Sequence, residues 1–341
     1  MPGTRLSLTR PQILAFRRRV GALDERLPAG PSSLRQAAWA GLQDSMPRAA
    51  LLSIHARVEG TEPSTWEDPS LVQLWGPRFS VFVVAARDLA VFSLGLLPDH
   101  EKRRRRSEDM AERLRVHLGG RRMAYGQAGH GLGLHDAYML RYAAATGTVL
   151  LRWDGARQPF IWIVPSPEAS PTEARLELAR RYLHIYGPTT VESFSWWSGI
   201  GPRGASAAFG ELRESLTPAQ TPIGDAWILT QDEEVVRADP QPAPPARLLP
   251  SGDAYLLLNG VDRDLLVADA DRRDQLWTPR VWPGGLLIDG EIAGTWRRAN
   301  AVMTLHPWRR LTGPEREVVT AEAESMPIPG IKGPVIVRWG D

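Results

Sequence analysis

The sequence predicts an α+β protein made of tandem winged-helix modules followed by a small C-terminal antiparallel β-barrel or sheet domain. Three observations support this fold class. Three helical segments precede a β-rich pair at the start of the chain, which is the element order of a winged helix. Helices followed by a hairpin then recur twice, at a spacing of about 70 to 100 residues. Beyond a proline-rich linker, the chain consists of short apolar runs separated by Gly, Asn and Asp turns.

The first winged helix is expected over residues 1–100. Apolar periodicity predicts its helices, and a β-rich stretch around Gly76-Pro77 predicts its hairpin. The three helices are expected within residues 6–23, 31–43 and 48–58, and the hairpin within residues 71–85.

The second winged helix is expected over residues 101–168. Its helices are predicted within residues 107–120 and 134–146, and its hairpin within residues 148–164, turning at Asp154-Gly155. The glycine-rich stretch 125–136 between the helices matches no phosphate-binding loop and is interpreted as a flexible loop.

The third winged helix is expected over residues 169–239, and the β domain over residues 246–341. Helices are predicted at 174–187, 189–199 and 202–216, with strands in 221–233 and Trp196 and Trp197 as core residues. The linker 237–250 holds five prolines and should be extended. Strands of the β domain are predicted within residues 254–260, 263–269, 282–298, 300–308 and 333–341.

Composition excludes several classes of protein. There is no cysteine, so no disulfide framework or thiolate metal site can form. No apolar run reaches the roughly 20 residues of a membrane helix, and the N-terminus lacks the apolar segment of a secretory signal. We therefore expect a cytoplasmic protein. Residues 1–150 carry 21 Lys and Arg against 14 Asp and Glu, and this excess favours a polyanionic partner for the first half of the chain.

The stretch "GLQDSMPRAAL" places Gln43, Asp44 and Ser45 side by side before Pro47. An amide such as Gln43 can hold a water molecule but cannot take its proton, whereas the carboxylate of Asp44 can do both. The alternative is structural, because Asp44 or Ser45 could be the N-cap of the helix that follows. The two roles do not exclude each other.

Three stretches resemble the AlkZ-like and YcaQ-like DNA glycosylases, a family of winged-helix DNA-binding proteins. They are "LARRYLHIYGPTTVESFSWWSGI", "LLPSGDAYLLLNGVDRDLLVAD" with "WPGGLLIDGEIAGTWRR", and "GLQDSMPRAALLSIHARVEG". The resemblance implies winged helices arranged around duplex DNA. It also implies hydrolysis of the N-glycosidic bond of alkylated purines, including bulky or crosslinked ones.

The resemblance places the family's catalytic motif on Gln43, Asp44 and Ser45. The family motif is Gln-x-Gln or Gln-x-Asp, so this chain keeps the first amide and has Ser45 at the second position. In the first hairpin, where we expect an Arg-Gly-Thr-x-His-like run, the chain keeps Arg78 and has Phe79 and Phe82 in place of Gly and His.

Arginine-rich segments are the candidate DNA contacts. Arg17, Arg18 and Arg19 form one helix edge, and the run from Lys102 to Arg106 is either a solvated face or linker, or a phosphate clamp. The predicted DNA-binding residues are Arg78, Arg17, Arg18, Lys102, Arg103, Arg104 and Arg203.

Two functions remain open at this stage. The first is a monofunctional glycosylase in which Gln43 places water and Asp44 acts as base or electrostatic stabiliser. The second is a non-catalytic DNA-binding protein, a damage sensor or regulator on the same scaffold. Either would act on double-stranded DNA near the nucleoid, as a monomer, without metal or cofactor.

Overall fold

The computed structural model describes residues 5–46, 48–155, 157–240, 242–331, 333 and 335–340. Helices alternate with three separate sheets, so the α+β class is confirmed. Pro47, which precedes the predicted third helix, lies outside the described residues. None of the helices in the described ranges is long and apolar enough to cross a membrane.

The first helices and hairpin follow the predicted order. The elements are α1 (Arg10–Val20), α2 (Pro31–Ala37), β2 (Leu42–Gln43), α3 (Ala49–His55), β3 (Leu71–Trp75), β4 (Val81–Ala85) and the short α4 (Leu89–Phe92). A capping box between Thr9 and Gln12 starts α1. The prediction of one helix over residues 31–43 is wrong at its end, because α2 stops at Ala37 and the chain then extends as β2.

The second group departs from prediction between its long helix and its hairpin. Its elements are α5 (Glu101–Leu118), β5 (Met123–Ala124), α6 (Tyr125–Gly131), a 3-10 helix (Ala137–Thr146), β6 (Val149–Arg152) and β7 (Phe160–Ile163). The loop expected at 125–136 contains α6, and a 3-10 helix replaces the expected α-helix. The close contact between α6 and the 3-10 helix depends on Gly129, because a Cβ there would lie 2.8 Å from the Cβ of Ala137 on the 3-10 helix.

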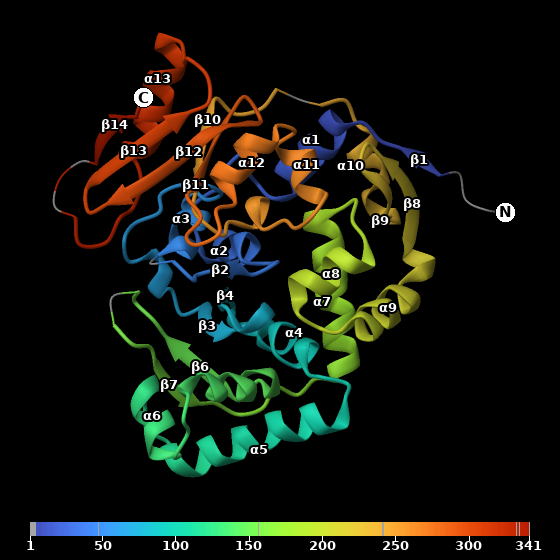
Figure 1. The fold of residues 1–341 in the computed structure, drawn as a ribbon, viewed down its shortest axis with the longest axis vertical. Coiled ribbons are helices and arrows are strands. Elements are labelled where there is room, and N and C mark those ends of the chain that lie inside the picture. The colour runs from blue at the N-terminus through green and yellow to red at the C-terminus, as the bar shows by residue number, and fades with distance from the viewer. Residues whose placement is uncertain are drawn as a thin grey trace.

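The two hairpins do not form separate sheets. They join through the pairing of Gln73 with Leu151 into one six-stranded sheet of order β2-β4-β3-β6-β7-β5. Figure 1 shows this sheet at the centre and lower left, with α5 crossing below it. The predicted turn at Asp154-Gly155 lies between β6 and β7, which pair antiparallel as expected.

The three helices of the third group form in the predicted order, but the last one ends at Glu211, before the predicted end at residue 216. Its elements are α7 (Pro171–Tyr186), α8 (Val191–Ser198), α9 (Pro202–Glu211), β8 (Leu216–Thr221), β9 (Gly224–Leu229) and α10 (Glu233–Arg237). β8 and β9 form a hairpin, as expected, but it begins at Leu216 and not at residue 221, because residues 216–220 are strand and residues 230–233 are helical. The N-terminal strand β1 (Leu6–Ser7) adds to β8 in parallel. The N-terminal strand therefore completes a sheet more than 200 residues away in sequence, and the two lie together at the right of Figure 1.

The C-terminal sheet is five-stranded. Its strands are β10 (Ala246–Leu249), β11 (Gly284–Ile288), β12 (Glu291–Ala299), β13 (Val302–Pro307) and β14 (Ile336–Trp339), in that order. β14 runs parallel to β13, so the expectation of an entirely antiparallel sheet is wrong at this edge. Helix α13 (Gly313–Glu324) connects these two strands and permits the crossover.

Two predicted strands of this region are helical. Residues 254–256 form a 3-10 turn, and residues within 263–269 belong to α11 (Asp262–Leu266), which is followed by α12 (Ala270–Leu276). The Asp253 carboxylate accepts the Tyr255 N–H at 2.9 Å and starts the first turn. A short buried apolar run does not reveal its secondary structure by periodicity, which explains both errors.

Candidate functional site

The motif lies on a strand end and not on a helix. Gln43 pairs with Phe82 of β4, and the Asp44 N–H donates to the Val81 carbonyl at 2.7 Å. In extended backbone, residues i and i+2 point to the same side. Gln43 Nε2 accordingly donates to Ser45 Oγ at 3.0 Å. A helix end is therefore not needed to bring these two side chains together.

Asp44 points the opposite way, into the protein. It is 2% exposed. Its Oδ1 accepts the Ala50 N–H at 3.0 Å, and its Oδ2 accepts from Gln73 Nε2 at 2.6 Å. Ala50 lies in the first turn of α3, so Asp44 does the work of a cap, although Arg48 occupies the N-cap position with a φ of 65°.

The orientation of the Gln73 amide is set by the second hairpin. Gln73 Oε1 accepts the Trp153 N–H at 2.8 Å, and Nε2 donates to the Trp153 carbonyl at 3.2 Å. The remaining N–H of this amide can only donate, so it requires an acceptor at Asp44. Burial raises the pKa of Asp44 to about 6, against the lowering effect of the hydrogen bonds from Ala50 and Gln73. The carboxylate is therefore mostly ionised at neutral pH.

Two cations lie beside this carboxylate. The guanidiniums of Arg48 and Arg152 lie 3.4 and 3.3 Å from the ring centroid of the buried Trp66. Both lower the pKa of Asp44 electrostatically. Arg48 also donates to the Trp153 carbonyl at 3.2 Å. The inward side of the motif is thus a polar network that ties the first hairpin to the second.

The outward side of the motif has an acceptor without a partner. Gln43 is half-buried, and its Oε1 is buried with no hydrogen-bond partner among the described residues. Gly252 packs against it, because a Cβ at Gly252 would lie 3.4 Å from Gln43 Cδ. The amide is therefore held between Ser45 and the loop that precedes the turn at 254–256, with its oxygen left over to accept a hydrogen bond.

A buried ion pair holds that loop against α3. Arg57 makes two bonds to the Asp253 carboxylate, at 2.7 and 2.8 Å, and both side chains are almost fully buried. Ser53 Oγ donates to the same carboxylate at 2.7 Å, and Arg57 also donates to the Ser53 carbonyl at 2.8 Å. The loop that contacts Gln43 is thus anchored on the helix that follows the motif.

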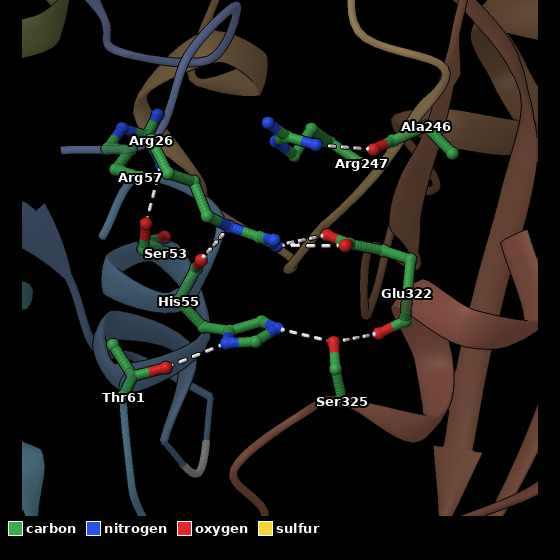
Figure 2. Close-up of polar contacts among 9 residues, drawn as sticks. All are labelled: Arg26, Ser53, His55, Arg57, Thr61, Ala246, Arg247, Glu322 and Ser325. Carbon is green, nitrogen blue, oxygen red and sulfur yellow. Dashed lines mark hydrogen bonds and ion pairs between the residues drawn. The ribbon is translucent and has the colours of Figure 1, made fainter. Parts of the chain in front are cut away.

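Figure 2 shows a second set of contacts between α3 and α13. Arg26 donates to both oxygens of Glu322, at 2.7 and 2.8 Å, and to the His55 carbonyl at 2.8 Å. The His55 ring bonds to Thr61 Oγ1 at 2.7 Å and Ser325 Oγ at 3.1 Å. Burial lowers the pKa of His55 to about 3, and Arg26 adds to the effect, so the imidazole is neutral. This junction fixes α13 against α3, the helix that follows the motif.

A groove opens between the motif and the C-terminal sheet, and its volume is about 340 Å³. Met46 and Ser251 form its border with the motif, and Arg297 and Arg298 lie on β12. The remaining lining side chains are mostly apolar: Ala49, Leu52, Pro250, Val281, Trp282, Pro283 and Trp296.

Two of the predicted DNA contacts are structural. Arg17 is 4% exposed and donates to the carbonyls of Tyr186, Gly187 and Pro188. Arg18 is 5% exposed and pairs with Asp24 at 2.7 Å. The prediction that they bind DNA is therefore wrong, because both charges face the interior of the protein: Arg17 the backbone at the end of α7, and Arg18 the Asp24 carboxylate and the Gly290 carbonyl. Arg19, their neighbour, is exposed.

The other predicted contacts reach the surface. Lys102, Arg103 and Arg104 are exposed on α5, so the basic run is helical and not a linker. Arg203 is exposed in the first turn of α9. Arg78 is partly buried at the hairpin tip, where its guanidinium lies 4.0 Å from the centroid of Trp196.

The sequence alone did not predict a role for Gln73 or for the ion pair Arg57–Asp253. Gln73 carries a weak signal, since a polar residue stands in the middle of the apolar strand "LVQLW". The ion pair joins residues 196 positions apart and has no local signature.

Comparison with known proteins places the chain in a family. The sequence profile described as DNA glycosylase AlkZ-like matches residues 37–327. A stretch of 142 residues is 28% identical to a Streptomyces sahachiroi protein described as an interstrand DNA cross-link repair glycosylase, and it covers 40% of this chain and only 38% of that relative. The structure of Streptomyces sahachiroi DNA glycosylase AlkZ has the same fold, with a TM-score of 0.78 at 20% identity over 98% of this chain and 100% of that one. The chain belongs to the AlkZ-like DNA glycosylase family.

Proposed function

We propose that this protein is a monofunctional DNA glycosylase that hydrolyses the N-glycosidic bond of alkylated purines in duplex DNA, with Gln43 as the residue that holds the attacking water. The observation that carries the proposal is the Gln43 amide: its Nε2 is committed to Ser45, while its buried Oε1 has no partner among the described residues. That oxygen can accept a hydrogen bond from a water molecule.

The chemistry suits an amide. A purine alkylated at N7 carries a positive charge, so the C1′–N9 bond can break with its electron pair moving to the purine, which leaves as a neutral base. Water then forms a bond to C1′ of the cationic sugar on the opposite face and loses a proton to solvent. No general acid is needed, and the protein's task is to position the water and stabilise positive charge on the sugar.

Asp44 contributes electrostatically in this scheme. Its side chain points away from Gln43 into the protein, where each oxygen accepts a hydrogen bond, so it is not placed to take the proton of a water held by Gln43. An ionised carboxylate next to Gln43 in the chain favours a cationic sugar. Ser45 supplies the acceptor that orients the amide.

DNA binding would use five basic residues of the helix and hairpin groups that reach the surface. We propose that these three groups act as tandem winged-helix modules (residues 1–100, 101–168 and 169–239), with residues 246–341 as a β domain beside the motif. Arg78, Lys102, Arg103, Arg104 and Arg203 would contact phosphates, and the groove beside Met46 would admit a bulky adduct. We further propose that the protein acts as a monomer on damaged chromosomal DNA.

The second candidate is a non-catalytic DNA-damage sensor on the same scaffold. It is favoured by Ser45, which places a short hydroxyl where the family has an amide or carboxylate, and by the buried, fully bonded Asp44.

A duplex carrying one N7-alkylated guanine separates these two functions. Alkaline cleavage after incubation reports abasic sites. Wild type should release the base, and Gln43→Ala should lose at least tenfold in rate. Gln127→Ala, which removes an exposed amide on α6, is the matched control and should retain the wild-type rate. Intact DNA binding with no release from small or bulky adducts would establish the non-catalytic sensor instead.

A further inference from the structure

A second cavity, of about 370 Å³, lies where the three helix and hairpin groups meet. Its walls come from the tip between β3 and β4, the first turns of α5, the 3-10 helix and the end of α8. Three guanidinium groups line it, those of Arg78, Arg103 and Arg106. Among the described residues that line it, none is Asp or Glu.

The basic run on α5 divides into two faces. Arg104 and Arg105 pair with Glu108 and Glu101 on the solvent side. Arg103 and Arg106 are three positions apart, so they share a face of the helix, and that face lines the cavity. Neither has a carboxylate partner within ion-pair distance in the described part of the chain.

The positive charge of Arg78 also has no carboxylate partner among the described residues, although its guanidinium lies against the Trp196 ring. Its Nε is buried with no hydrogen-bond partner among the described residues, and its φ of 54° is a conformation that a non-glycine residue rarely adopts. The chain directs this side chain across Gly199, where a Cβ would lie 3.3 Å from Arg78 Cγ. A buried N–H of a charged group without an acceptor is costly, and a ligand that supplies an anionic oxygen would satisfy it.

The other walls are aromatic and apolar. Phe79 and Tyr142 meet edge to face with centroids 5.5 Å apart, and Arg106 lies 3.8 Å from the Tyr142 centroid. A volume of about 370 Å³ exceeds the need of a bare phosphate ion and matches the lower range of small-ligand sites.

We propose that this cavity is a phosphate-binding site for one nucleotide unit, with Arg78, Arg103 and Arg106 around the phosphate and Phe79 and Tyr142 beside the attached sugar and base. The phosphate can come from a DNA strand or from a free nucleotide. Only the DNA source rests on the proposed function, and neither source requires that the protein cleave a glycosidic bond.

Two double variants of the full-length protein test the site. Arg103→Gln with Arg106→Gln removes two cavity cations. Arg105→Gln with Arg115→Gln removes the same charge from the paired, solvent-facing side of α5. Thermal melting first confirms that both fold. Anisotropy of an undamaged, labelled duplex is then measured over a range of salt concentrations, and thermal shift is measured with a deoxynucleoside 5′-monophosphate and with the same nucleoside without phosphate.

For a DNA phosphate, the cavity double should weaken duplex binding at least tenfold and lower the slope of log K against log salt by about 0.9 for each lost contact, while the control loses less than threefold. For a free nucleotide, the monophosphate should raise the melting temperature of wild type but not of the cavity double, and the nucleoside should raise neither. Equal losses in both doubles, together with no difference between monophosphate and nucleoside, would overturn the proposal.

Ala145→Phe fills the cavity and leaves all three guanidiniums in place. Binding lost in this variant supports a site inside the cavity, whereas binding retained at the wild-type level would overturn it in favour of a surface field. The glycosylase assay is read separately. A wild type that releases no base but passes these binding tests refutes the proposed function and leaves the phosphate site standing.

Discussion

Gln73 Nε2 donates to Asp44 Oδ2 at 2.6 Å, and this bond couples the candidate catalytic motif to the second hairpin. The same amide is held at both ends by the backbone of Trp153. Because the two hairpins share a sheet only through Gln73 and Leu151, the Asp44–Gln73 bond lies at the seam between them. A residue that the motif alone suggests as a general base is therefore part of the joint between two parts of the fold.

That joint predicts strong energetic coupling. Asp44→Ala leaves the Ala50 N–H and one N–H of the Gln73 amide without an acceptor, and each unpaired buried group should cost about 1–3 kcal/mol of unfolding free energy. Gln73→Ala should also destabilise, and the double variant should be less destabilised than the sum of the two. Urea unfolding of the four proteins gives the coupling energy, expected at about 0.5–3 kcal/mol. Additivity to within about 0.3 kcal/mol would show that the bond contributes little.

The sequence was a good guide to the helices with clear local signals and a poor one to this joint. Helices α1, α7, α8 and α9 follow apolar periodicity with Pro or Gly at their ends, which are local signals. The shared sheet and the parallel strands β1 and β14 depend on contacts between distant segments, and no local pattern encodes them.

The candidate site shows the same division. The stretch 43–45 stands out by composition, and its position as a motif came from resemblance. Its geometry depends on a strand that is only two residues long, where tertiary pairing with β4 overrides the helical pattern that precedes it. Arg17 and Arg18 have the composition of a DNA-binding edge, but distant segments bury them. Arg17 bonds to the backbone at the end of α7, about 170 positions away, and Arg18 bonds to the Gly290 carbonyl.

Ser45→Gln is expected to raise the rate of base release. The substitution puts a second amide beside Gln43, as in the Gln-x-Gln motif, and Ser45 is exposed, so the longer side chain has room. We expect at least a tenfold faster release of an N7-alkylated guanine, followed by alkaline cleavage of the duplex.

Ser32→Gln, at an exposed position in the first turn of α2, is the control and should not change the rate. If both variants release base at the wild-type rate, the short hydroxyl at position 45 does not limit the reaction.

His55 predicts a loss of stability at mildly acid pH. Its pKa is lowered to about 3 in the folded protein, below the value of about 6.5 for a free imidazole, so the unfolded chain binds the proton first. The contribution of His55 is fully present above pH 6.5 and is lost as pH falls from there toward 3. His55→Gln, which does not titrate, should show a flatter decline of unfolding free energy between pH 7 and pH 4.

The control for this experiment is His130→Gln, because His130 is exposed on α6. That variant should follow the wild-type pH profile. A His55→Gln profile that runs parallel to wild type would mean that the junction between α3 and α13 opens before the imidazole is protonated.

Asp253→Asn tests whether the loop that holds Gly252 and Asp253 positions Gln43. The substitution removes the anion that compensates Arg57, and breaking a buried pair in this way typically costs about 3–5 kcal/mol of unfolding free energy. Glu112→Gln breaks the exposed Arg115 pair instead and should leave the unfolding free energy close to that of wild type. Because Asp253 anchors the loop that packs on Gln43, base release should also slow while the affinity for undamaged duplex stays within about threefold of wild type.

Measured at a temperature where both variants are folded, a rate unchanged from wild type would make Arg57–Asp253 a purely structural pair. A rate that falls with affinity retained would identify Asp253 as a positioning residue for the water-holding amide, since a general loss of folding would reduce binding and release together.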